Sequence, residues 1–349
     1  MGCNAPPSKN LVMDKKYLSA SKIKKLNSCS WAYWCRYELN LPDGTNDGAK
    51  RGSICHLVFE VLGNKRHRKH FTKIIRKQNA FASEAVERLV RYHAAKEEVD
   101  DADNLEMIRE MLLKGLNWDF FGLNLGKPAE SISEYKFKIE KNDFPIRYNA
   151  IGFIDKLFLY KKKKRGLIRD FKTSKKMLVP AEVDDNLQDW LYSLAVRHDF
   201  PEYKNRQSEF VFLRFMDTPK DGIQLMEPLT DEMLDAFELE LSHYQQVIEE
   251  FDAKDAVSNF AADQGFPTDN TFSGKLSCGF AEYPQHLKQD GSFRWHCSYK
   301  FSFDYYSVID FNGEVVKNYM EDDFDESVVK DDQLWIKRTY DGCPRHKKY

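Results

Sequence analysis

The sequence lacks three features, each of which would place the protein in a particular class. No run of about 18 apolar residues occurs, so no membrane-spanning helix is expected. The first 16 residues include polar and charged residues where a secretory signal needs an apolar stretch. Seven cysteines in 349 residues, an odd number, do not form a small secreted disulfide framework. We therefore expect a soluble, intracellular protein of the cytoplasm with no membrane partner.

A large net charge is also missing, because 53 Lys and Arg stand against 55 Asp and Glu, a net charge of −2. The two signs are nevertheless separated along the chain. Residues 1–180 carry 36 Lys and Arg and 21 Asp and Glu, a net charge of +15, whereas residues 181–349 carry 17 and 34, a net charge of −17. The basic half could neutralise nucleic-acid phosphates. Equally, the two halves could be solvated faces that attract each other.

What is present is enough apolar material for a core, with 42% hydrophobic and 14% aromatic residues, which excludes a wholly disordered chain. A helical spacing of apolar residues dominates up to about residue 121 and then gives way to alternation. Ser19 is expected to cap the first helix. Further helices are predicted over residues 52–62, 67–99 (one or two helices), 105–121, 184–196 and 231–251. Strands are predicted over residues 132–139, 151–160, 166–172, 207–215 and 222–226.

This order of elements predicts an α/β or α+β fold with a mixed central sheet flanked by helices. We expect residues 1–128 to form an N-terminal helical region and residues 129–264 to form the core that carries the sheet. Residues 265–349 are aromatic and then acidic without a clear period, so an irregular C-terminal extension is predicted.

Four short segments combine residue types that suit metal-dependent phosphate chemistry. An antiparallel hairpin across the basic turn at residues 161–166 would bring Asp155 and Asp170 close together. Two neighbouring carboxylates repel each other, and a divalent cation such as Mg2+ or Mn2+ relieves that repulsion. Lys172 lies on the same side of its strand as Asp170 and could hold or deprotonate an attacking water. The four segments are Gly52-Ser-Ile-Cys-His56, Gly152-Phe-Ile-Asp155, Asp170-Phe-Lys172-Thr173 and Gln188-Asp-Trp-Leu-Tyr192.

Each segment alone has an ordinary structural explanation. A single histidine such as His56 is more often a hydrogen-bonded structural residue than a ligand. An isolated acid in a strand is usually a turn or edge residue, and Asp-x-Lys arises by chance in chains of this length. Gln188 and Tyr192 share one helix face because they are four residues apart, which suits hydrogen bonding to a phosphate or to the lysine. Metal-dependent phosphate chemistry is therefore indicated only because the four segments occur together and in this order.

That order resembles the RecB-like branch of the PD-(D/E)XK nucleases, which includes phage exonucleases and CRISPR adaptation nucleases. The opening from Tyr17 to Tyr37 is also similar to the start of that family, and the resemblance extends to about residue 216. It implies a divalent-metal-dependent deoxyribonuclease, an exonuclease acting in recombination, repair or viral genome processing, in the host cytoplasm if the chain is viral. By this resemblance the metal ligands are His56, Asp155 and Asp170, the catalytic lysine is Lys172, and Gln188 and Tyr192 support the site. The family often has Glu where Asp170 stands.

Two other functions fit the same sequence. One is a catalytically silent DNA-binding module, and the other is an adaptor subunit whose acidic half docks on a helicase, a single-strand-binding protein or another replication protein. The intact Asp155, Asp170 and Lys172 favour the enzyme. No feature of the sequence indicates an oligomeric state. A basic helix is either a path for the DNA backbone or a solvated face, and it contains Lys65, Arg66, Arg68, Lys69, Lys73, Arg76 and Lys77.

Some members of this branch hold a 4Fe-4S cluster with one N-terminal and three C-terminal cysteines. The corresponding cysteines would be Cys29, Cys278, Cys297 and Cys343. Their last three are 19 and 46 residues apart, whereas the family's are close together. Reduced, partly buried thiols are the interpretation we favour from sequence, and zinc needs the same four ligands. No role is assigned to Cys3, Cys35 and Cys55.

Overall fold

The structure is a computed structural model and describes residues 15–44, 46–174, 176–179, 182–183, 186–215, 221–264, 278–289 and 291–346. The helices are α1 (Ala20–Ser28), α2 (Ser30–Tyr33), α3 (Asp47–Gly63), α4 (Arg68–Lys77), α5 (Glu84–Lys96), α6 (Ala102–Asn117), α8 (Leu187–Asp199) and α9 (Asp231–Glu250). The strands are β1 (Glu130–Asp143), β2 (Ile146–Tyr160), β3 (Arg165–Lys172), β4 (Asn205–Phe212), β5 (Ile223–Leu225), β6 (Phe303–Asp310), β7 (Val315–Met320) and β8 (Gln333–Tyr340).

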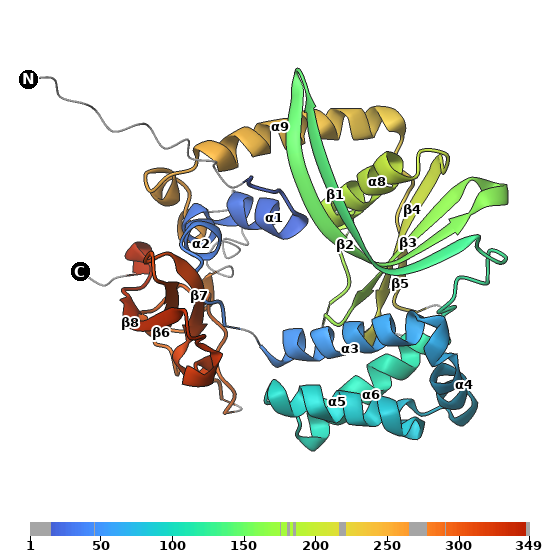
Figure 1. The fold of residues 1–349 in the computed structure, drawn as a ribbon, viewed down its shortest axis with the longest axis horizontal. Coiled ribbons are helices and arrows are strands. Elements are labelled where there is room, and N and C mark those ends of the chain that lie inside the picture. The colour runs from blue at the N-terminus through green and yellow to red at the C-terminus, as the bar shows by residue number, and fades with distance from the viewer. Residues whose placement is uncertain are drawn as a thin grey trace, which may run out of the picture.

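A five-stranded mixed sheet forms the centre of the molecule, with the strands in the order β1-β2-β3-β4-β5 (Figure 1). The pairs β1–β2, β2–β3 and β4–β5 are antiparallel, whereas β3 and β4 are parallel. Parallel neighbours cannot be joined by a tight turn and need a crossover, which is supplied by the segment that contains α8. The antiparallel pairing of β2 with β3 confirms the predicted hairpin. The prediction of a mixed sheet flanked by helices is also confirmed.

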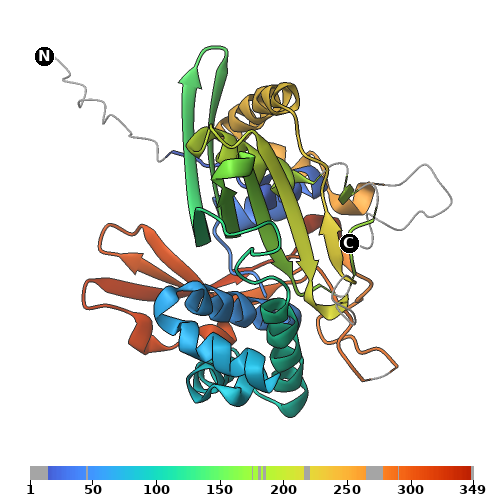
Figure 2. The ribbon, with the colours of Figure 1, turned by 90° about the vertical axis from the view of Figure 1, so that its right-hand side faces the viewer.

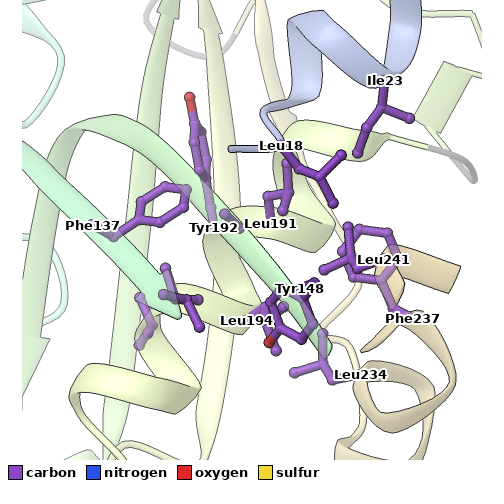
Figure 3. Close-up of a cluster of buried hydrophobic side chains, with 14 of the residues drawn as sticks. Leu18, Ile23, Phe137, Tyr148, Leu191, Tyr192, Leu194, Leu234, Phe237 and Leu241 are labelled. Carbon is purple, nitrogen blue, oxygen red and sulfur yellow. The ribbon is translucent and has the colours of Figure 1, made fainter. Parts of the chain in front are cut away.

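One face of this sheet packs against α8 and α9 to form the larger core. Leu191 and Leu194 of α8 meet Leu234, Phe237 and Leu241 of α9 over the inner residues of β1 and β2, and all of these side chains are buried (Figure 3). The N-terminal segment joins the same core, because its backbone pairs with β2 through a bridge between Leu18 and Ala150. Ser19 caps α1 as predicted, by accepting a hydrogen bond from the backbone N–H of Lys22.

The opposite face packs against the helical layer α3–α6, which lies below the sheet in Figure 1. Phe59 of α3 meets Phe171 of β3 with ring centroids 4.3 Å apart, and Phe120 lies beside both. This layer lies within residues 1–128, the predicted N-terminal helical region, whereas α1 and α2 of that range pack elsewhere. Its long predicted helical stretch over residues 67–99 is divided into α4 and α5, because Gln78 adopts a left-handed conformation that ends α4.

The C-terminal extension differs from its prediction. Residues 303–340 form a second, three-stranded antiparallel sheet in the order β7-β6-β8, and it lies beside α1 and α2 (Figures 1 and 2). Residues 278–289 and 291–302 contain no long helix or strand, as expected. The sheet was missed because most positions of β7 and β8 are exposed or only half-buried, so they show no alternation of apolar and polar residues.

The remaining elements match their predictions to within a few residues. Helix α8 begins at Leu187, and the predicted start of that helix at Asp184 lies outside the described residues. Among the described residues, no helix combines the length and the apolar character needed to cross a membrane.

Candidate active site

Helix α3 carries His56 to the sheet because a glycine lets the helix approach the end of β3. Asn46 caps this helix by accepting a hydrogen bond from the N–H of Ala49. A Cβ atom on Gly52 would lie 2.9 Å from the hydroxyl oxygen of Thr173, closer than a side chain can normally come. One turn further along α3, His56 Nδ1 lies 3.2 Å from Asp155 Oδ1 of β2. The Gly-x-x-x-His spacing thus reflects a close contact between helix and strand.

Two acids occupy positions where the paired strands β1 and β2 depart from regular alternation. Ile132 and Tyr135 both pack on the large core although they are three residues apart, and Glu134 between them has a left-handed backbone with φ of 49°. On β2, Ile154 and Leu157 likewise face that core on either side of Asp155. Such a left-handed conformation is costly for a residue other than glycine and commonly marks a functional position. The irregularity turns both carboxylates out of the core face.

His56, Glu134 and Asp155 together form a group of three potential metal ligands. One donor atom from each lies within 4.8 Å of the others. Two carboxylates and one imidazole suit a divalent cation such as Mg2+ or Mn2+, which leaves further coordination positions to water and phosphate oxygens. The second oxygen of Asp155 accepts a hydrogen bond from the N–H of Phe171 at 2.7 Å, which fixes the orientation of the carboxylate. The residues present therefore fit a metal ion.

Asp170 and Lys172 form a second, adjoining group. Lys172 Nζ lies 2.7 Å from Asp170 Oδ2 and donates a hydrogen bond to Gln188 Oε1 at 2.6 Å. The other oxygen of Asp170 accepts hydrogen bonds from the hydroxyl of Tyr192 at 3.3 Å and from Gln188 Nε2 at 3.5 Å. Gln188 and Tyr192 thus clamp the carboxylate and the ammonium group from α8, as their helical spacing predicts.

The charges in the site perturb one another. Burial lowers the pKa of His56, but the hydrogen bond to Asp155 and the surrounding carboxylates outweigh burial and raise that pKa to about 9. Burial, followed by the charge of Asp155, raises the pKa of Glu134 to about 7. Burial also raises the pKa of Asp170, partly opposed by Lys172. Each shift reflects negative charge gathered away from water, which a bound cation would offset.

All these side chains line one large cavity of about 1800 Å3. Its walls come from the N-terminal part of α3, from the ends of β2 and β3, and from the C-terminal extension. Nucleic acids and other polymers need such room, since small-molecule sites typically occupy about 300–1,000 Å3.

The structure brings His56, Asp155, Asp170, Lys172, Gln188 and Tyr192 to this cavity, where Glu134 joins His56 and Asp155. Asp170, the third predicted metal ligand, contacts Lys172 and is not one of the three clustered donors, so its role as a ligand stays a prediction. Glu134 was not singled out from the sequence. The available signal was an acid between two apolar residues, Ile132 and Tyr135, that fail to alternate.

The four cysteines of the extension and α1 also come together. Cys29, Cys278, Cys297 and Cys343 line one small cavity, although they are spread over more than 300 residues of sequence. Burial, followed by the neighbouring thiols, raises the pKa of Cys278 to about 12, and burial raises that of Cys343 to about 11. Among the described residues, no three cysteine sulfurs lie within 4.8 Å of one another.

The basic helix and the other cysteines have simpler surroundings. The seven Lys and Arg residues between positions 65 and 77 lie at the start of α4 and along it, and none of them lines the large cavity. Cys35 is buried and contacts the hydroxyl of Tyr340, and Cys55 is buried in the helical layer. Cys3 lies outside the described residues.

The chain is similar to a known protein family in sequence and to solved structures in part of its fold. The sequence profile of the PD-(D/E)XK nuclease superfamily matches residues 17–280. A crystal structure of a candidate exonuclease from Eubacterium rectale is similar at 13% identity and a TM-score of 0.40, over 71% of this chain and 86% of that chain. The crystal structure of SSO0001 is similar at 14% identity and a TM-score of 0.24, over 51% of this chain and 73% of that chain. No curated protein matches the sequence.

Proposed function

Because the chain belongs to the PD-(D/E)XK nuclease superfamily, we propose that it is a divalent-metal-dependent deoxyribonuclease acting at the site around Asp155. The observation that carries this proposal is the convergence of His56, Glu134 and Asp155 from three elements, beside an ammonium group that is held in place. These three residues would hold Mg2+ or Mn2+. When bound, the metal lowers the pKa of a coordinated water and offsets charge on the scissile phosphate.

The chain's own residues supply positioning. Asp155 is oriented by the Phe171 N–H, and its other oxygen lies 3.2 Å from His56 Nδ1 within the ligand group. Lys172 is fixed by Asp170 and Gln188, which leaves its remaining N–H donor for the attacking water or a phosphate oxygen. A donor held in this way needs no reorganisation as charge develops on the phosphate. Tyr192 positions Asp170, to which its hydroxyl donates, and Gln188, from which it accepts.

We propose an exonucleolytic mode and a role in recombination, repair or viral genome processing. The mode is supported by the position of the site, which is faced by α3 and by the extension within one cavity. A strand end can enter such a cavity more readily than the middle of a duplex. DNA is the proposed partner, and helicases, single-strand-binding proteins or other replication proteins are proposed to deliver it.

The test is cleavage of end-labelled linear DNA with and without Mg2+. We expect Glu134→Gln to lose nearly all cleavage, because the amide keeps the shape of the side chain but is a poor metal ligand. Glu60→Gln is the matched control, since Glu60 lines the same cavity outside the ligand group. Equal rates for wild type and Glu134→Gln would contradict the site. A wild type that binds DNA without cleaving it would favour the silent DNA-binding module.

The mode is tested separately with a covalently closed single-stranded circle. An exonuclease leaves the circle intact while it degrades the same sequence once the circle has been linearised. Cleavage of both forms at similar rates would show an endonuclease instead.

We also propose that Cys29, Cys278, Cys297 and Cys343 hold a 4Fe-4S cluster. All four thiols line one small cavity, and four thiolates are the ligand set of a 4Fe-4S cluster. A cluster there would link α1 to the extension.

Iron analysis of anaerobically purified protein tests the cluster. We expect about four irons per chain, and the iron should be lost in Cys297→Ser but kept in the control Cys35→Ala, because Cys35 does not line the small cavity. Stoichiometric zinc, or no metal at all, would contradict this proposal.

A further inference from the structure

The wall that the C-terminal extension contributes to the large cavity has an unusual surface. Phe293 and Trp295 leave 68% and 54% of their surface exposed. Neither ring stacks on another aromatic ring of the described chain. Large exposed rings are depleted from surfaces that bind nothing, because water hydrates them poorly. This wall therefore offers two open aromatic faces to whatever enters the cavity.

The backbone that carries these two rings is held on both sides. Isolated bridges pair Phe293 with Leu287 and His296 with Gly279, so the segment between them cannot drift freely. Gly279 has a φ of 73°, and a Cβ atom there would lie 2.2 Å from the carbonyl oxygen of Trp295. Only glycine allows this close approach. The backbone that carries the rings is thus held in place, so little backbone entropy is lost when a ligand binds.

Charge divides the cavity into two zones. The acids Glu134, Asp155 and Asp170 gather at the metal end. Among the described residues, those of the extension that line the cavity include no acid, and they carry basic groups on Lys288 and Arg294. Arg294 is only half-buried and lines the cavity, so its guanidinium group can pair with a phosphate oxygen. Phosphates would be attracted to the basic zone and repelled from the acidic end unless metal is bound there.

We propose that Phe293 and Trp295 form a stacking wall for unpaired bases, with Arg294 and Lys288 on the phosphates, so that DNA reaches the active site as a single strand. The cavity size favours a polymer over a small molecule. Bases of a duplex are already stacked on one another, whereas bases of a single strand are free to stack on aromatic side chains. This inference rests on the proposed nuclease function for the identity of the polymer.

The experiment is equilibrium binding in EDTA, which does not depend on cleavage. The probes are a fluorescein-labelled single-stranded DNA oligonucleotide and the blunt duplex of the same sequence. Each base stack is worth enough to weaken binding by about tenfold when its ring is removed. We expect Phe293→Ala/Trp295→Ala to lose about a hundredfold in single-strand affinity while duplex affinity changes little. Phe311→Ala is the matched control, because Phe311 is 71% exposed on the same extension but does not line the cavity.

The outcomes separate this inference from the proposed function. Unchanged single-strand affinity in the double variant, or equal losses on both probes, overturns the stacking wall even if the wild type cleaves DNA. A wild type that cleaves nothing in Mg2+, but whose single-strand binding depends on both rings, overturns the nuclease and keeps the wall. Gly279→Ala supplies a second check, since displacing the segment should weaken single-strand binding while both rings remain present.

Discussion

The two sheets of this protein meet opposite conditions. The five-stranded sheet is covered on both faces, and six consecutive residues of β3, Gly166–Phe171, are buried. In the three-stranded sheet, the six residues before the last in β8 are exposed. A sheet covered on both sides can hold charged groups such as Asp170 in fixed positions, away from water. The extension that carries the open sheet also exposes the rings of Phe293 and Trp295 to a ligand. We therefore propose that the chemistry takes place at the five-stranded sheet and that the extension contacts the substrate.

We expect the largest effect on cleavage from Asp155→Asn. This variant tests whether residues of the five-stranded sheet carry out the chemistry. The amide oxygen can still accept the hydrogen bond from Phe171, whereas alanine would leave that buried N–H without a partner. Loss of the charge should lower Mg2+-dependent cleavage by about a thousandfold or more, ~4 kcal/mol in the barrier. The melting temperature in EDTA should stay level or rise, because one of several repelling carboxylates is gone. Cleavage at a near wild-type rate would assign the chemistry elsewhere.

Lys172→Ala comes next, because it separates positioning from binding within the same sheet. We expect the single-turnover rate to fall by about 10²–10⁴-fold, while affinity for DNA in EDTA changes little. If affinity and rate fell in parallel, Lys172 would instead be a phosphate clamp. The melting temperature must be measured alongside, since Asp170 then keeps a buried carboxyl group without its cation.

The same contrast explains what the sequence could predict. Strands β2 and β3 were predictable because burial on both faces demands long apolar runs, within which Asp155 and Asp170 stand out. Strand β8 was not, since Leu334, Trp335 and Ile336 are all exposed and carry no period. Glu134 was missed for a related reason, because its left-handed backbone breaks the alternation by which strand residues are assigned to faces.

Long-range convergence was also beyond sequence spacing. The distances in sequence between the four cysteines argued against a common site, yet the extension folds back so that Cys278, Cys297 and Cys343 meet Cys29. Spacing is informative only where residues share one helix or one strand pair, as Gln188 and Tyr192 do. Docking of an extension onto a distant helix depends on tertiary packing that no local pattern records.

Arg169→Met should have the third-largest effect, which is a loss of stability rather than of activity. Arg169 is 1% exposed, pairs with Glu209 at 2.5 Å, and donates to the backbone oxygens of Trp118 and Asp119. Its loss leaves the buried Glu209 carboxylate with the Trp118 indole N–H but no cation, and should cost about 3–5 kcal/mol in the free energy of unfolding by urea. Adding Glu209→Gln should restore part of that loss. The exposed pair of Arg345 with Asp263 is the control from the extension, where Arg345→Ala should cost about 0–1 kcal/mol.

The smallest effect, Asp189→Asn, depends on pH. Asp189 is 4% exposed in the first turn of α8, and burial raises its pKa from 3.8 to about 6, against hydrogen bonds from Ser208 and Ser193. Because the folded pKa lies above the unfolded one, the folded state binds the proton more tightly. The stability contributed by protonated Asp189 is therefore complete below about pH 4 and is lost as the pH rises through about 6.

The difference in the free energy of unfolding between Asp189→Asn and wild type should consequently grow as the pH rises. The two proteins should unfold with similar free energies near pH 4, and the variant should be more stable by about 2–3 kcal/mol at pH 7. Urea titrations at several pH values measure this difference. Asp103→Asn is the matched control for the same change in the first turn of a helix, because Asp103 occupies the first turn of α6 but is exposed to water. If the stability difference for Asp189→Asn did not change with pH, burial between α8 and the five-stranded sheet would not penalise charge. The contrast between the two sheets would then lose its energetic basis.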